Sequence, residues 1–153
     1  MPQRSGLQQD IDVFFRNINS INGLYHQFAK QLGVSYSTLA VLYCLYLHRP
    51  CTQKNIGDNW WLPKQTVHNV CKEMLEKQWI EVVNMPDAPR GKYLNLTAAG
   101  LAYAEPIVGQ IIALERRAFD SLDENERKQL VAFTGRYVRI IEDLLAQAYS
   151  EKT

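Results

Sequence analysis

One stretch of the 153-residue sequence, residues 52–100, restricts the possible folds more than any other part of the chain. It reads as a short helical segment, a turn, a second helix and two strand-like segments around a loop of turn residues. In chain order these are residues 52–58, 59–63, 63–78, 79–85 and 92–97, with the loop at 86–91. Two short helices followed by a β-hairpin predict a winged helix-turn-helix, because an α-helix fits the major groove of DNA.

The second helix of this stretch has two different faces. Apolar residues recur at i, i+3, i+4, i+7 and i+8 from Val67 to Leu75, which indicates a helix packed on a core. The opposite face carries amide, hydroxyl, imidazole and ammonium groups, which can contact base edges and phosphates. An ordinary amphipathic helix with a solvated polar face has the same pattern. The candidate DNA contacts on this helix are Lys64, Gln65, Thr66, His68, Asn69 and Lys72.

The loop between the two strand-like segments adds positive charge at an exposed tip. Asp87, Pro89 and Gly91 are typical turn residues, and Arg90 and Lys92 lie among them. A narrow minor groove attracts an inserted arginine. A polar-faced helix followed directly by an arginine-tipped hairpin therefore favours DNA binding, and Arg90 and Lys92 join the candidate contacts.

Several short segments resemble the MarR family of bacterial transcriptional regulators. They are Leu62–Val67, Met74–Glu81, Arg90-Gly91 followed by Leu96–Gly100, and, upstream, Gly33–Leu42. The resemblance covers nearly the whole chain and lies in the order and spacing of these segments rather than in one motif. It departs from the family at Trp79, which stands where a glycine usually ends the recognition helix. It also departs at Asp87, which is one residue further from Arg90 than in the commoner spacing.

The resemblance implies a homodimer that binds double-stranded DNA at a pseudo-palindromic operator and represses transcription. It also implies control by a small aromatic or lipophilic effector, bound in a crevice between the dimerisation helices and the DNA-binding domain. Aromatic residues of that region are Tyr25, His26, Tyr43, Tyr46, Trp60 and Trp61. Each of these residues, considered by itself, is more typical of a hydrophobic core than of a ligand contact.

The fold class that we expect is mainly α, a winged helix flanked by long helices. The winged helix-turn-helix domain is predicted at 34–100, and a helical dimerisation domain at 7–33 and 101–150. The flanking helices have wide apolar faces that a monomer of this size would have difficulty covering, which predicts a two-fold dimer. A monomeric helical subdomain is the alternative.

Particular residues are expected to begin, end or interrupt these helices. Pro106 lies inside the helix that follows the hairpin, where a kink or a break is expected. The expected helix ends and caps are Gly33, Ser35, Thr52, Thr97 and Asp123.

Composition and charge give little guidance about the partner. The formal net charge is +1, whereas many DNA-binding domains are far more basic, so a DNA-binding surface has to arise from local arrangement. No apolar run has the length of a membrane span, and the first residues lack the apolar core of a signal peptide. We therefore expect a cytoplasmic protein with no membrane partner.

No arrangement of residues predicts an enzyme, a cofactor or a metal site. The three cysteines and three histidines lack the spacings of zinc ligands, and there is no glycine-rich phosphate loop. Cys44 and Cys71 occupy apolar helical positions and are expected to be buried and inert. Cys51, beside Pro50 in a predicted loop, is the candidate oxidisable thiol. Two alternatives to an effector-controlled DNA-binding regulator remain open: a winged-helix protein-interaction module and a cysteine-based redox-sensing regulator.

Overall fold

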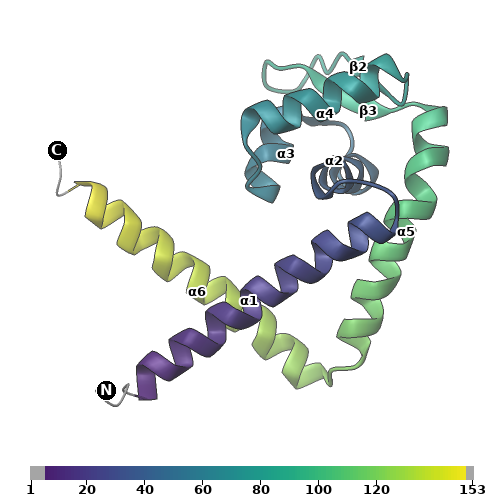
Figure 1. Cartoon of the computed structure of the whole chain (residues 1–153). Helices are drawn as coiled ribbons and strands as arrows, with labels where there is room; N and C mark the ends of the chain where they lie inside the picture. The colour runs from purple at the N-terminus through teal and green to yellow at the C-terminus, as the bar shows by residue number, and fades with distance from the viewer. Residues whose placement is uncertain (1–5, 151–153) are drawn as a thin grey trace. The chain divides into compact units, whose positions relative to one another are not determined.

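A computed structural model describes residues 6–150, which form six helices and a three-stranded antiparallel sheet (Figure 1). In chain order the elements are α1 (Gly6–Gln31), α2 (Tyr36–Leu47), β1 (Cys51–Thr52), α3 (Gln53–Trp60), α4 (Lys64–Glu76), β2 (Ile80–Val83), β3 (Tyr93–Leu96), α5 (Ala98–Asp120) and α6 (Glu124–Ser150). The chain divides into two compact units between Gln110 and Ile111. The predicted mainly α fold, with two short helices followed by a hairpin, is confirmed.

The core of the first unit is built around α2, which is apolar on nearly every side. Half of its twelve residues are buried, and both α3 and α4 pack against it. The side chains that α4 and the sheet add to this core are Val67, Cys71, Met74, Ile80, Leu94 and Leu96. Leu75, the last residue of the predicted apolar stripe on α4, is 36% exposed, so the buried stripe is narrower than predicted.

Helix caps lie where the sequence predicts them. Gly33 has a positive φ of 78° after α1, and the backbone N–H of Thr38 donates to Ser35 Oγ at the start of α2. Each such bond satisfies a backbone donor that the first turn of a helix leaves unpaired. The remaining caps are Thr52 with Asn55 before α3, Thr97 with the N–H of Gly100 before α5, and Asp123 with Glu126 before α6.

The ends of α4 differ from the prediction by one or two residues. Pro63 is the N-cap rather than the first helical residue, and the helix ends at Glu76 rather than Gln78. Gln78 adopts a left-handed conformation with φ 57°, and its N–H donates to Leu75 O at 3.0 Å. The N–H of Trp79 donates to the carbonyl oxygen of Met74, which completes a motif that usually has glycine at the left-handed position. The expectation that Trp79 takes the place of that glycine is wrong by one residue, because Gln78 does.

A third strand, β1, was not predicted. It pairs antiparallel with β3, with Cys51 opposite Leu94, so the sheet order is β1-β3-β2. Cys51 therefore lies in the sheet and is only 6% exposed, and burial raises the pKa of its thiol to about 12. The prediction that Cys51 lies in a loop is therefore wrong, and its burial counts against its role as the candidate oxidisable thiol. The prediction that Cys44 and Cys71 are buried is confirmed.

Helix α5 runs through Pro106 without a break, contrary to one of the two expected outcomes there. In the second unit, Arg127 Nη1 donates to the carbonyl oxygens of Leu122 and Phe119, at 2.7 and 3.3 Å, and so stabilises the turn between α5 and α6. No residue of α6 is buried, and large apolar side chains along it are exposed. None of the helices within residues 6–150 is long and apolar enough to cross a membrane.

Candidate nucleic-acid interface

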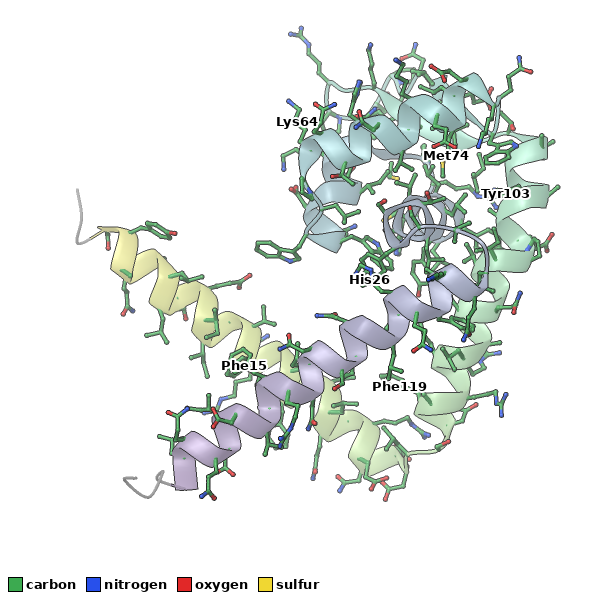
Figure 2. The ribbon with its side chains drawn as sticks, viewed as in Figure 1. Phe15, His26, Lys64, Met74, Tyr103 and Phe119 are labelled. Atoms are coloured by element: carbon green, nitrogen blue, oxygen red, sulfur yellow. The ribbon has the colours of Figure 1, made fainter. Side chains whose placement is uncertain are left out.

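The polar face of α4 is presented to solvent, opposite the side that packs on the core. Met74 points inward, whereas Lys64 projects from the start of the helix (Figure 2). Thr66 is half-buried at the edge of the polar face. The other candidate contacts on this helix are exposed: Lys64, Gln65, His68, Asn69 and Lys72. The structure thus places all six predicted residues along one helix, and five of them are exposed.

Two side-chain interactions order this face. Gln65 Nε2 donates to Asn69 Oδ1 at 2.8 Å, a contact between residues one helical turn apart. Lys72 Nζ lies 3.9 Å from Glu76 Oε1, and both side chains are about two-thirds exposed. An exposed pair of this kind is weak, so the ammonium of Lys72 can exchange Glu76 for a phosphate. The bond between Gln65 and Asn69 was not predicted, although their spacing permits it.

The hairpin of β2 and β3 carries the remaining candidate residues, Arg90 and Lys92, both of them exposed. The N–H of Ala88 donates to the carbonyl oxygen of Met85 at 3.1 Å, which closes a turn early in the loop. Later in the loop, a Cβ built on Gly91 would lie 3.5 Å from Thr52 Cγ2. The loop therefore returns against β1 and the N-cap of α3.

The end of α4 is joined to the start of α5 through Trp79. Thr97 Oγ1 donates to the carbonyl oxygen of Gln78 at 2.7 Å. The N–H of Thr97 donates to the carbonyl oxygen of Trp79 at 3.0 Å. The rings of Trp79 and Tyr103 are stacked, with centroids 3.8 Å apart and planes at 15°. Lys77 Nζ lies 4.7 Å above the Trp79 ring. These contacts hold the end of α4 against the first turns of α5.

An aromatic cluster connects α1, α2 and α3. His26 stacks on Tyr36 with centroids 4.1 Å apart, and Trp60 meets Tyr36 and Tyr43 edge-on at 5.7 and 5.4 Å. The structure thus brings together three of the six aromatic residues that the sequence singled out. Tyr36 joins them unpredicted, because a lone tyrosine in the first turn of a helix carries no distinguishing pattern.

Trp61 does not belong to this cluster. Its side chain is 90% exposed and its backbone is left-handed, with φ 50°. The expectation that it is a core residue is wrong: the N–H of Trp61 donates to the carbonyl oxygen of Gly57 at the end of α3, and the ring is exposed to solvent. Trp61, Leu62 and Pro63 line a hollow of about 850 Å³, together with Lys54 and Lys64.

Comparison with known proteins places this geometry among transcriptional regulators. No protein-family model matches the chain, and no curated protein does. Among solved structures, a MarR family regulator from Neisseria meningitidis is 30% identical, with a TM-score of 0.80, over 90% of this chain and 97% of that one.

Two more distant structures share the fold. The Staphylococcus aureus MepR–DNA complex has a TM-score of 0.64 at 22% identity, covering 86% of this chain and 97% of that chain. Staphylococcus aureus MarR in complex with salicylate and kanamycin has a TM-score of 0.65 at 19% identity, covering 89% and 92%. The identity and coverage of the Neisseria regulator decide the family, and the arrangement of α3, α4 and the β2–β3 hairpin agrees with it. The chain belongs to the MarR family of transcriptional regulators.

Proposed function

We propose that this regulator is a dimeric, sequence-specific DNA-binding repressor whose affinity for its operator is set by a small-molecule effector. The observation that carries the proposal is the exposed polar face of α4, which extends from Lys64 to Lys72, together with the exposed Arg90 and Lys92 on the wing. A helix of this width enters the major groove, and a basic wing tip suits phosphates or the minor groove. The MepR–DNA complex, a structure of the same fold, supports this mode of binding.

The test of DNA binding is a gel shift on the intergenic DNA beside the protein's own gene, repeated at several salt concentrations. A dimer that neutralises 6–10 phosphates should lose about 10³–10⁵ in affinity between 50 and 200 mM salt. The footprint should show two half-sites about 10–10.5 base pairs apart, or a multiple of that spacing. The absence of any shift at low salt would instead favour the protein-interaction module.

The proposal of a dimer rests on exposed apolar side chains along the flanking helices. On α1, Leu7 and Leu24 are 71% and 63% exposed, and on α6 Phe133 and Leu144 are 62% and 55% exposed. Exposed apolar area on this scale is typical of interaction surfaces, and a two-fold pairing is the commonest way to cover it. We assign DNA binding to residues 34–100 and dimerisation to 7–33 and 101–150. Sedimentation that shows a stable folded monomer would contradict this assignment.

For the effector we propose an aromatic acid bound in the hollow beside Trp61. The exposed indole offers a stacking surface, and Lys54 and Lys64 offer ammonium groups for a carboxylate. The Lys54 ammonium is also paired with Asp58, whereas Lys64 begins the polar face of α4. A ligand that engages Lys64 would compete with DNA for the same ammonium and would thereby weaken DNA binding. Salicylate, the ligand named for Staphylococcus aureus MarR, is the probe of choice.

The effector proposal is tested by titrating salicylate into the protein–DNA complex and into the Trp61→Ala variant. Salicylate should release DNA from the parent at a lower concentration than from the variant, while both should bind DNA equally in its absence. The matched control is Trp60→Phe, at a neighbouring tryptophan that does not line the hollow. Equal release from the parent and from Trp61→Ala would remove the hollow as the effector site. A reporter gene placed downstream of the same intergenic DNA distinguishes a repressor, which should lower its expression, from an activator, which should raise it.

A further inference from the structure

The polar face of α4 contains one side chain that is already held by another. Gln65 Nε2 donates to Asn69 Oδ1 at 2.8 Å, and both residues are exposed on the face that we assign to DNA. Lys72, three residues after Asn69, has its ammonium directed to Glu76 at 3.9 Å. Asn69 is therefore oriented by Gln65, from the N-terminal side of the helix.

The orientation matters because the two ends of an asparagine amide are chemically opposite. Its oxygen only accepts hydrogen bonds, and its nitrogen only donates them. A side chain with no partner can rotate by half a turn and present the two groups in either order. In the structure the donor is Gln65 Nε2, which only the oxygen of Asn69 can accept, so the bond holds Asn69 Oδ1 toward Gln65 and leaves Nδ2 without a partner in this bond.

In this orientation Asn69 still has one acceptor position on Oδ1 and both N–H donors on Nδ2. The major-groove edge of adenine offers one acceptor, N7, and one donor, the N6 amino group. Guanine offers two acceptors, N7 and O6, so that Asn69 Oδ1 would face another oxygen. A fixed amide therefore matches adenine and opposes guanine, whereas an amide that is free to rotate can turn its oxygen away from guanine and donate from Nδ2 alone.

We propose that Gln65 is a positioning residue for base recognition: it fixes the amide of Asn69 so that each half-site is read with adenine at one position. This inference rests on the proposed DNA-binding function and adds a base preference and a division of roles to it. Asn69 contacts the base, and Gln65 acts through Asn69.

The experiment begins with selection of preferred duplexes from a random pool by the parent protein. The affinity ratio for adenine over guanine is then measured at each position of the selected half-site. Variants are Asn69→Ala, Gln65→Ala, Gln65→Glu and Gln65→Lys, with Gln147→Ala on α6 as the control for loss of an exposed glutamine. Because each ratio compares two duplexes with the same variant, changes in overall charge cancel.

At one position of each half-site the parent should prefer adenine by about tenfold or more. Asn69→Ala should abolish that preference, and the double variant Gln65→Ala/Asn69→Ala should equal Asn69→Ala alone. Glutamate cannot donate, so Gln65→Glu should lower the preference at least as much as Gln65→Ala. Lysine can donate to Asn69 Oδ1, so Gln65→Lys should retain it.

An unchanged ratio in Gln65→Ala and Gln65→Glu would overturn the positioning role and leave DNA binding intact. An unchanged ratio in Asn69→Ala would also overturn it. If no duplex is enriched from the pool and no salt-sensitive binding is detected, the proposed function itself fails, and this inference fails with it.

Discussion

Gly100 lies so close to Trp79 that no other residue fits at its position. A Cβ built on Gly100 would lie 1.7 Å from the carbonyl oxygen of Trp79 and 2.6 Å from its carbonyl carbon. Both atoms belong to the backbone and cannot rotate away. The same carbonyl oxygen accepts the N–H of Thr97, and the Trp79 ring stacks on Tyr103. The first turn of α5 thus packs directly on the chain that leaves the recognition helix.

Substitution of Gly100 should therefore destabilise the fold. Gly100→Ala should lower the free energy of unfolding by about 1–3 kcal/mol, because the methyl group forces the backbone of Trp79 or α5 to move. The control is Gly109→Ala, in the same helix, where nothing lies within 4 Å of the added methyl group. The free energy of unfolding of that variant should rise by about 0.5–1 kcal/mol, since alanine is the better helix former. Urea unfolding measures both, and equal stability of the two variants would contradict the close packing.

At Gln78 a substitution should instead stabilise the fold, because this residue has a left-handed conformation. A non-glycine residue in this conformation destabilises the folded state by about 1–2 kcal/mol, and glycine avoids this cost. Glycine also increases the entropy of the unfolded chain, which offsets about 0.5–1 kcal/mol of that gain. Gln78→Gly should therefore stabilise the protein by about 0.5–1 kcal/mol. Glu76→Gly, two residues earlier and still inside α4, should instead cost about 1 kcal/mol. A loss of stability in Gln78→Gly would show that the glutamine side chain makes a contact that outweighs the strain.

These two positions show what sequence can and cannot predict here. The caps at Ser35 and Asp123 were predictable because the chemistry of a cap is local to three or four residues. Gln78 was not, because glutamine seldom adopts a left-handed conformation, and the hydrogen bonds that accompany it there include one from the distant Thr97. The packing of Gly100 on Trp79 joins residues 21 positions apart, so it belongs to the tertiary structure.

The candidate site was predictable to the same degree. Helical periodicity places Gln65, Asn69 and Lys72 on one polar face with Thr66 and His68 at its flanks, and turn chemistry places Arg90 at the wing tip. The bond between Gln65 and Asn69 needs the rotamers of both side chains, which periodicity leaves open. Cys51 was misplaced because β1 has only two residues, too few for any alternating pattern, and its burial depends on pairing with β3.

Burial of the thiols predicts an alkaline loss of stability. The pKa values of Cys51 and Cys71 are raised to about 12 by burial, whereas an unfolded chain titrates its thiols near 8.5. Below about pH 8.5 the thiols are neutral in both states, so their burial carries no penalty there. Above that pH the unfolded state loses its protons first, and stability should fall by up to about 1.4 kcal/mol per pH unit for each thiol until pH 12.

Urea midpoints of the parent and of Cys51→Ala between pH 7 and 10 measure this effect. The variant should lose less stability with rising pH than the parent, because one of the thiols with a raised pKa is absent. The same burial should protect Cys51 from iodoacetamide at pH 8 in the folded protein. If peroxide releases DNA from the parent but not from Cys51→Ala, the redox-sensing alternative becomes the better description.

The wing should contribute affinity without base preference. Arg90 is exposed in the loop between β2 and β3, where it can reach a phosphate or the minor groove, and neither carries much sequence information. Arg90→Ala should therefore weaken binding to the selected operator and to a scrambled duplex by similar factors. It should also reduce the slope of log K against log salt by about one per subunit.

Arg116→Ala, which removes an exposed arginine from α5, is the charge-matched control and should change neither quantity. All three proteins should keep the same melting temperature, so a change in affinity reports on the contact rather than on the fold. A loss confined to the operator would mean that Arg90 reads bases, and the wing would then share recognition with α4.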